Sequence, residues 1–431
     1  MITVGMDLEQ FLEDPFGSGI QRVLQQLTLH WPASDVGALF AIPDGDHFVV
    51  LDRSQAQAIL SLPFTMTRSE AEERGLAAHV RDVLDSLDVR RLTAAELVDT
   101  LDVWCLPEVS YLPSVLDRFE QFAEQLPTVM IGYDTLPMTQ AQNYRIPPWA
   151  AANASRYFRI LTRAGGLLCI SDFARESIIE RLRRDTTLPI AVAHPGGDHL
   201  DPARSVDVTR RSGPVRFLRL GTMEARKHPQ EITAAFQAVR SEGADIELAF
   251  VGAPSTSDLG INDDIARAAR DDAALTWMTD ASDADVQRLI DDADVFLSFG
   301  IEGFGIPVVE AVRRGKPVLF GGTQPAAEAL VGVGAIDAGG DDVDAISRSL
   351  RDYASPSSVQ TITRAVEPLR VPQWRDFAQG LQDVVAQVTR SLLVEAGWLI
   401  EENCQTNRHA NAPVQWLDQW THPRQRRREP W

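Results

Sequence analysis

The stretch EGFGIPVVE, residues 302–310, places two glutamates on either side of a Gly-Phe-Gly turn. The apolar run before it, DVFLSFG, predicts a buried strand that ends at Glu302. The two glycines allow a tight turn, and Pro307 stands in the first helical turn, where proline is tolerated. A helix that begins here leaves backbone N–H groups free to bind phosphate. The sequence therefore predicts a phosphate-binding turn between two carboxylates.

Glu310 is expected about one turn into this helix, beside such a phosphate. A carboxylate there repels phosphate but accepts hydrogen bonds well from a pair of sugar hydroxyls. Two carboxylates around a phosphate cradle therefore suit a ligand with hydroxyls on both sides of its phosphates, as in a nucleotide sugar. The alternative is a tight turn with two solvated glutamates.

Outward from this turn, apolar runs alternate with helical patterns from residue 215 onward. Strands are predicted at VRFLRLGT, IELAFVG, LTWMT, DVFLSF and PVLF, and helices at 229–240, 262–270, 283–291, 306–314 and 342–353. This alternation predicts βαβ units and a parallel sheet covered on both faces. Such sheets bind ligands at the carboxyl ends of their strands.

A second α/β domain is predicted over residues 1–200. Its strands are expected at ITVGMDL, TVMIGYD, GGLLCIS and IAVAHPGG, and a Gly17-Ser18-Gly19 turn leads into a helix, IQRVLQQLTLHW. Residues 54–125 have a largely helical pattern. A polar linker at 201–214 precedes the second domain, residues 215–372, and a helical region with a tail follows at 373–431. We expect two doubly wound domains that face each other across a cleft.

The bulk composition excludes several classes of protein. The chain has 431 residues, of which 44% are hydrophobic and 24% charged, as in soluble proteins of two or three domains. Its net charge of -20 argues against nucleic-acid binding. No apolar run approaches the ~18 residues of a membrane span, and the start lacks a signal-peptide pattern. Cys105, Cys169 and Cys404 show neither metal-ligand nor disulfide spacing, so a cytoplasmic location is expected.

Arginine carries almost all of the positive charge. Only Lys227 and Lys316 are lysines among the 41 basic residues. Arg226 and Lys227 follow a predicted strand end, where a guanidinium fork and an ammonium group together suit phosphate. The alternative is two surface basic residues at the start of a helix. Lys316 is expected to be a solvated turn residue.

At this point a family resemblance emerges. SFGIEGFGIPVVEAVRRGKPV resembles the signature of the retaining glycosyltransferases of family 4, the group 1 glycosyl transferases with an E-x7-E motif. LRLGTMEARKHPQEITAAF resembles the family's first C-domain strand and phosphate-binding turn. CISDFARESI and HPGGDHL resemble the end of its N-terminal domain, and FGSGIQRV its glycine-rich loop. The resemblance implies a GT-B fold, with two Rossmann-like domains and a C-terminal helix that crosses back to the N-terminal domain.

The resemblance also implies roles for individual residues. Arg226 and Lys227 would hold the donor diphosphate, and Lys227 would neutralise charge on the departing nucleotide. Glu310 would contact the ribose and Glu302 the transferred sugar. The backbone N–H groups of the turn would bind the phosphates; this turn consists of Gly303, Phe304 and Gly305.

Two features of the N-terminal domain complete the expected donor site. Gly17 and Gly19 would let this domain approach the donor closely. YDTLP, residues 133–137, stands where many family members have His-Asp-Leu-Ile-Pro. Tyr133 can donate a hydrogen bond but does not exchange protons near neutral pH as histidine does. Asp134 remains as an orienting acceptor.

The function implied is retaining transfer of a hexose from a GDP- or UDP-linked donor to a hydroxyl acceptor, such as a bacterial surface glycan precursor. The leaving diphosphate would take the acceptor's proton, and the protein would position the reactants and stabilise charge. Neither a cofactor nor a metal is expected. Three alternatives stay open: a double displacement with Glu302 as nucleophile, a catalytically degenerate partner subunit, and a related epimerase or phosphorylase.

The end of the chain combines tryptophan with arginine. Its residues of these two types are Trp398, Trp416, Trp420, Arg424, Arg426, Arg427, Arg428 and Trp431. We expect this tail to pack on its own domain. The alternatives are contact with the inner face of an anionic membrane or with a second copy of the chain.

Overall fold

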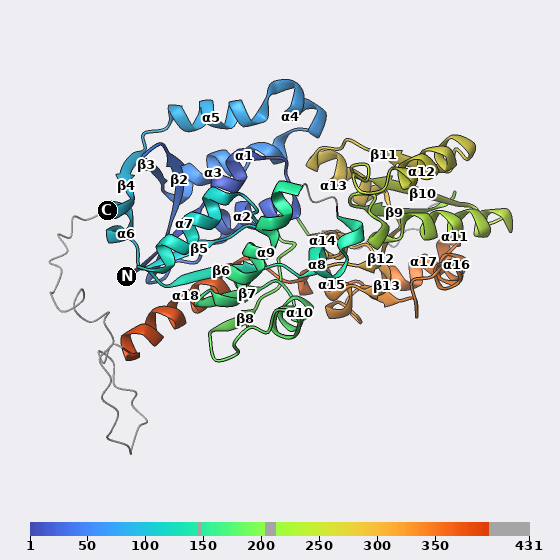
Figure 1. Ribbon diagram of the computed structural model, residues 1–431. Coiled ribbons are helices and arrows are strands. Elements are labelled where there is room, and N and C mark those ends of the chain that lie inside the picture. Colours follow the sequence, from blue (N-terminus) through green and yellow to red (C-terminus); the bar gives the residue numbers. More distant parts are fainter. Residues whose placement is uncertain (145–147, 203–212, 396–431) are drawn as a thin grey trace, which may run out of the picture.

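Two β-sheets organise the molecule, one in each half of the chain (Figure 1). The computed structural model describes residues 1–144, 148–202 and 213–395. Helices flank both sheets, and the two domains lie side by side (Figure 1). The predicted pair of Rossmann-like α/β domains is therefore confirmed.

The N-terminal sheet has eight strands in the order β4-β3-β2-β1-β5-β6-β7-β8. Strand β3 pairs antiparallel with β2 and β4, and all other neighbours are parallel. The strands are β1 (Ile2–Asp7), β2 (Val36–Asp44), β3 (His47–Leu51), β4 (Arg90–Thr93), β5 (Val103–Leu106), β6 (Thr128–Gly132), β7 (Gly166–Cys169) and β8 (Ile190–Val192). The helices are α1 (Glu9–Glu13), α2 (Gly19–His30), α3 (Arg53–Leu60), η1 (Leu62–Thr65), α4 (Arg68–Arg74), α5 (Leu76–Ser86), α6 (Ala94–Thr100), α7 (Pro113–Ala123), α8 (Leu136–Thr139), η2 (Ala141–Asn143), α9 (Pro148–Arg163) and α10 (Asp172–Leu182).

The C-terminal sheet has six parallel strands in the order β11-β10-β9-β12-β13-β14. Its strands are β9 (Val215–Leu220), β10 (Ile246–Val251), β11 (Leu275–Met278), β12 (Val295–Ile301), β13 (Val318–Thr323) and β14 (Ala335–Asp337). The helices are η3 (Ala225–Lys227), α11 (Pro229–Ser241), α12 (Leu259–Asp271), α13 (Asp283–Asp292), α14 (Ile306–Arg313), α15 (Pro325–Ala329), α16 (Val343–Asp352), α17 (Pro356–Thr363) and η4 (Pro368–Arg370). In sequence numbering this is the order 3-2-1-4-5-6 of a dinucleotide-binding sheet.

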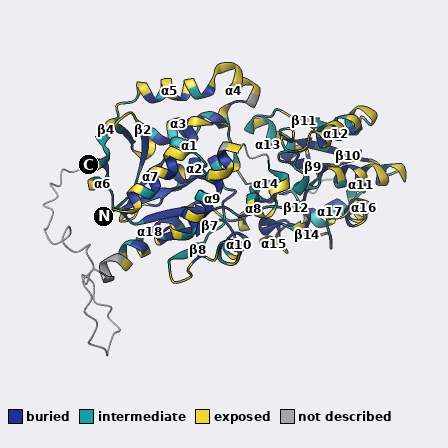
Figure 2. Ribbon diagram, in the orientation of Figure 1, coloured by how far each residue is buried: buried dark blue, intermediate teal, exposed yellow. Residues whose placement is uncertain are grey.

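Burial explains why the strands of the second half were easier to predict. The first six residues of β12, Val295 to Gly300, are all buried, as expected for a strand covered by helices on both faces. Figure 2 shows the strands as the buried layer and the outward faces of the helices as exposed. Residues 54–125 were predicted as largely helical, but they also contain β4 and β5. β5 is only four residues long and fully buried, so it has neither the length nor the alternation that reveals a strand.

The last described helix, α18 (Trp374–Glu395), returns to the N-terminal domain. It packs against α2 and against strands of the N-terminal sheet, including β6, β7 and β8 (Figure 1). Its Trp374, Phe377 and Leu381 are buried there. The Trp- and Arg-rich tail lies outside the described residues. Within the described ranges, no helix is both long and apolar enough to cross a bilayer.

Candidate functional site

The site lies where the order of the C-terminal sheet reverses. Strands β9 and β12 are neighbours, but the chain leaves them for opposite sides of the sheet. The carboxyl ends of two such strands form a crevice that binds ligands in sheets of this kind. The turn with Arg226 and Lys227 follows β9, and Glu302 follows β12. The topology therefore brings together the two motifs that the sequence separates.

Gly300 allows this close approach. Its φ is +90°, and a β-carbon there would lie 2.0 Å from the carbonyl oxygen of Arg226. No other residue fits without moving the turn. The approach lets Arg226 Nη1 donate to the Ile301 carbonyl oxygen at 2.7 Å and to Oε2 of Glu302 at 2.8 Å.

Glu302 lies among three cations. Besides Arg226, Lys227 Nζ is 3.3 Å from Oε1, and Arg219 Nη2 is 3.8 Å from the same oxygen. Burial favours the neutral acid, but Lys227, Arg226 and Arg219 outweigh it and lower the pKa of Glu302 to about 2. Glu302 is therefore a carboxylate at any physiological pH.

A second carboxylate, Glu224, pairs with Arg226 Nη2 at 2.6 Å. Burial opposes the charge of Arg226, yet Glu302 and Glu224 raise its pKa above the usual value. Burial lowers the pKa of Lys227, despite the nearby Glu302. The group of three cations and two carboxylates, hereafter the cation cluster, carries a net charge of +1. A partly buried positive group at a switch point suits an anion.

The backbone of the glycine turn faces the same crevice. No hydrogen bond from the backbone N–H groups of residues 303–305 is found within the part of the chain that the structure describes. Gly305, with φ of +107°, precedes the first residue of α14, as the Pro307 position predicts. This turn is the predicted cradle of free donors at a helix N-terminus.

The N-terminal domain closes over this turn. Ser171 Oγ donates to the Gly303 carbonyl oxygen at 2.6 Å. Asp134 lies on the other side, and burial raises its pKa to about 6, although the Leu136 N–H and Arg226 favour the charged form. Gly19 is the first residue of α2. A β-carbon on Gly19 would lie 3.9 Å from Cδ1 of Ile306 in the C-terminal domain. Gly17 has φ of +71° and packs against η1 of its own domain.

Glu310 lies in α14 and has a different partner. Its Oε1 is 2.9 Å from Nε2 of His199, which follows the HPGG turn at the end of the N-terminal domain. Burial would raise the pKa of Glu310, but the His199 contact outweighs burial and lowers it. Glu310 is thus an ionised carboxylate with 12% of its side chain exposed.

Tyr133 is not among the residues that the structure brings to the switch point. Its ring is in the core of the N-terminal domain, and its hydroxyl donates to the Pro107 carbonyl oxygen at 2.8 Å. Burial raises its pKa well above the usual value. The hydroxyl is therefore engaged within its own domain.

Two lysines have two different environments. Lys227 is in the cation cluster, but Lys316 is not the solvated turn residue that was predicted. Its Nζ donates to the carbonyl oxygens of Asp291 and Ala293, at 2.7 and 2.8 Å. These carbonyls end α13, so Lys316 caps a helix C-terminus.

Arg219, Glu224 and His199 were missed by the sequence analysis. Arg219 had a detectable signal, because a charged residue inside the apolar run VRFLRLGT needs a partner once it is buried. No group of three or more His, Cys, Asp or Glu side chains suited to a metal occurs among the described residues.

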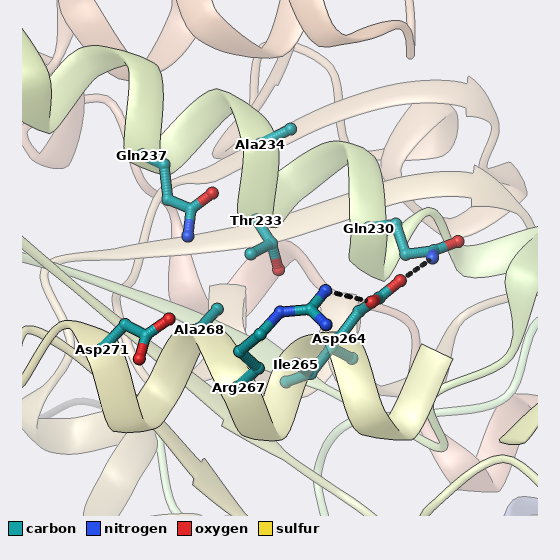
Figure 3. Close-up of a pocket in the computed structure, with 9 residues that line it drawn as sticks. All are labelled: Gln230, Thr233, Ala234, Gln237, Asp264, Ile265, Arg267, Ala268 and Asp271. Atoms are coloured by element: carbon teal, nitrogen blue, oxygen red, sulfur yellow. Dashed lines mark hydrogen bonds and ion pairs between the residues drawn. The ribbon is translucent and has the colours of Figure 1, made fainter. Parts of the chain in front are cut away.

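A shallow groove of about 220 Å³ lies elsewhere, between α11 and α12 (Figure 3). Asp264 accepts a hydrogen bond from Gln230 and pairs with Arg267 at its rim. Both helices are at the end of the C-terminal domain remote from the N-terminal domain (Figure 1). None of the residues of the switch point lines this groove.

Comparison with known proteins agrees with the geometry. Residues 204–353 match the family model described as glycosyl transferases group 1. The matched residues cover most of the C-terminal domain. The group 1 match spans η3, β12 and α14, and so includes the cation cluster and the glycine turn.

Relatives and solved structures extend the comparison. The serotype-specific mannosyltransferase WbdA of Escherichia coli is 26% identical over an alignment of 213 residues that covers 44% of this chain. The chain spans only a quarter of that relative's length, 25%. A glycosyltransferase from Rickettsia africae has a TM-score of 0.59 at 12% identity, over 90% of this chain and 98% of that one.

Two further structures have similar folds. Sucrose-phosphate synthase from Thermosynechococcus elongatus has a TM-score of 0.58 at 14% identity, over 92% of this chain and 100% of that one. HepE from Anabaena, in complex with UDP and glucose, has a TM-score of 0.54 at 14% identity, over 93% and 100%. These likenesses show a GT-B fold, and the residues that match the family model lie in its C-terminal half.

Proposed function

We propose that the chain is a retaining glycosyltransferase that moves a hexose from a GDP- or UDP-linked donor to a hydroxyl acceptor. The observation that carries the proposal is the cation cluster beside the N–H groups of residues 303–305, which have no hydrogen-bond partner among the described residues. A diphosphate placed there would meet Arg226, Lys227 and the N-terminus of α14 together. The name of the curated relatives favours a mannosyl donor, and a bacterial surface glycan as the acceptor.

The chemistry follows from the electrostatics. The bond between the sugar and the diphosphate breaks, and the acceptor oxygen bonds to the sugar from the same face. The leaving diphosphate takes the acceptor's proton. Lys227 and Arg226 stabilise the charge that develops on the diphosphate, each by about a hundredfold in rate. Glu302 stays ionised and can accept hydrogen bonds from sugar hydroxyls.

This mechanism requires neither a metal nor another cofactor. The cation cluster, with its net charge of +1, and a helix N-terminus would stabilise the diphosphate in place of a divalent ion. We also propose that the enzyme is cytoplasmic. Its C-terminal tail would contact the inner face of the membrane or a second copy of the chain.

The test is a thermal-shift panel of nucleotides and nucleotide sugars, paired with hydrolysis of each donor. Wild type and Glu310→Ala are compared. Stabilisation by one nucleotide series, slow hydrolysis of its sugar donor, and loss of both in the variant would support the proposal. Binding without turnover, with or without acceptors, would favour a nucleotide-sugar-binding partner subunit instead. Absence of nucleotide binding would refute both interpretations.

A further inference from the structure

The HPGGDHL segment, residues 194–200, is the joint between the two domains. The chain leaves the N-terminal domain through it and returns through residues 371–374. The two crossings are hydrogen-bonded to each other. The Gly197 N–H donates to the Pro372 carbonyl oxygen at 3.1 Å, and the Trp374 N–H donates to Asp198 Oδ1 at 2.7 Å.

The two glycines of this segment fit it between two helices. A β-carbon on Gly196 would lie 2.2 Å from the backbone nitrogen of Trp374, at the start of α18. A β-carbon on Gly197 would lie 2.7 Å from Cγ1 of Val309 in α14. Neither contact leaves room for a side chain. The joint is therefore in direct contact with the helix that carries Glu310.

A chain of two hydrogen bonds crosses this joint. Trp374 Nε1 donates to His199 Nδ1 at 3.0 Å, and His199 Nε2 is 2.9 Å from Glu310 Oε1. The indole N–H can only donate, so Nδ1 must accept and a neutral His199 carries its proton on Nε2. That proton points at Glu310. Trp374 is 1% exposed and the His199 side chain 6%, so water competes little for either bond.

We propose that Trp374 and His199 position the Glu310 carboxylate for the ribose of the donor, which makes His199 a positioning residue of the nucleotide site. This role rests on the proposed function. No partner of the Glu310 carboxylate other than His199 is found in the described ranges. His199 holds Oε1, which leaves Oε2 to accept from a ribose hydroxyl. The domain joint is thus part of the donor site.

The test compares the affinity of nucleoside diphosphates with and without ribose hydroxyls. Isothermal titration would use GDP and UDP and their 2′,3′-dideoxy counterparts. His199→Phe removes the donor to Glu310, so we expect a loss of about tenfold for the ribonucleotide and little loss for the dideoxy compound. Trp374→Phe keeps an aromatic ring but no longer fixes the proton of His199 on Nε2. We expect a smaller loss in the ratio of the ribonucleotide affinity to the dideoxynucleotide affinity than in His199→Phe. His199→Gln places an amide N–H near the Nε2 position and should restore most of the ratio.

Trp31→Phe is the matched control. Trp31 Nε1 also donates a buried hydrogen bond, to the Val36 carbonyl oxygen at 2.9 Å, but within the N-terminal domain. Its ratio should equal that of wild type. If His199→Phe does not fold, Trp374→Phe and His199→Gln decide the question. An unchanged ratio in the folded variants would overturn the positioning role alone. If wild type bound no nucleoside diphosphate, the proposed function would fall, and this role with it.

Discussion

Gly303 of the C-terminal domain lies so close to Asp134 of the N-terminal domain that a β-carbon on Gly303 would fall 2.3 Å from Asp134 Oδ2. Ser171 contacts the same residue through its hydroxyl. The absence of a side chain at position 303 therefore lets the two domains meet at the turn where the diphosphate is proposed to bind.

Gly303→Ala should impair turnover through this contact. The added methyl group would displace Asp134 and hold the domains apart at the crevice, so we expect kcat/KM to fall at least about tenfold. Donor kinetics and the melting temperature should be measured together. Gly37→Ala is the control, because a β-carbon on Gly37 would meet only the Ile2 carbonyl oxygen, at 3.9 Å. Turnover within twofold of wild type in Gly303→Ala would contradict the argument.

Glu302→Gln should destabilise the protein while leaving diphosphate binding intact. Removal of this carboxylate leaves three partly buried cations with one anion, a cost of about 3 kcal/mol in unfolding free energy. A bound diphosphate restores the balance, so GDP or UDP should raise the melting temperature more in the variant than in wild type. Turnover should fall, because Glu302 is proposed to contact the sugar.

The surface pair of Glu247 and Arg216 provides the control for this experiment. Their charged groups are 3.4 Å apart, and both side chains are nearly half exposed. Glu247→Gln should change the unfolding free energy by no more than about 0.5 kcal/mol. An equally small effect in Glu302→Gln would show that the cation cluster does not depend on its carboxylate.

Substitution of Lys227 should mainly reduce activity, whereas substitution of Lys316 should mainly reduce stability. Lys227→Ala leaves two cations against two carboxylates, so we expect a small change in stability and a loss of turnover of about a hundredfold. Lys316→Ala removes two hydrogen bonds at the end of α13 and should cost about 1–2 kcal/mol with kcat unchanged. Urea unfolding and donor turnover on both variants decide this. The reverse pattern would place the phosphate site elsewhere.

The sequence predicted the C-terminal domain better than the N-terminal one for a physical reason. Strands such as β12 are covered on both faces and appear as continuous apolar runs, whereas β5 has four residues and lies between helical segments. The antiparallel strands β3 and β4 were not anticipated at all. β3 depends on pairing with β2, and β4 depends on pairing with β3, so both rest on tertiary contacts and not on a local pattern.

The residues of the site also differ in how well the sequence predicts them. Glu302, Arg226 and Lys227 were predicted because each follows a strand end within a recognisable turn. Arg219 and His199 were missed because their importance depends on neighbours far away in the chain, Glu302 and Glu310. Lys316 was predicted to be a solvated residue because it lies in a turn. In the fold its ammonium group instead binds the Asp291 carbonyl oxygen at the end of α13. Local patterns reveal the element that carries a residue and not the partner that it meets.

Tyr133→Phe should leave turnover nearly unchanged. The hydroxyl bonds only to the Pro107 carbonyl oxygen among the described residues, so its loss should cost about 1 kcal/mol in stability and change kcat/KM by no more than about threefold. Steady-state kinetics on the best donor would check this. A loss of a hundredfold or more would show that Tyr133 turns toward the donor during catalysis, as its place in the YDTLP motif suggests.

Glu108 should make stability depend on pH. It follows β5, is 2% exposed, and burial together with the charge of Asp7 raises its pKa to about 8 from an ordinary value of 4.5. The folded state therefore holds this proton more tightly than the unfolded chain. Its stabilising contribution is fully present below pH 4.5 and is lost as pH rises toward 8.

Glu108→Gln removes this dependence because the amide is neutral throughout. The variant and wild type should melt at similar temperatures at pH 5, because both side chains are uncharged in the folded state and this pH is close to the ordinary pKa of 4.5. At pH 7 the variant should gain ~3 kcal/mol relative to wild type, and more at pH 9. Thermal melts at the three pH values measure the difference, with the exposed Glu124→Gln as a control whose difference should not vary. A difference for Glu108→Gln that stayed constant from pH 5 to 9 would mean that Glu108 is ionised in the folded protein, with a buried partner that stabilises its charge.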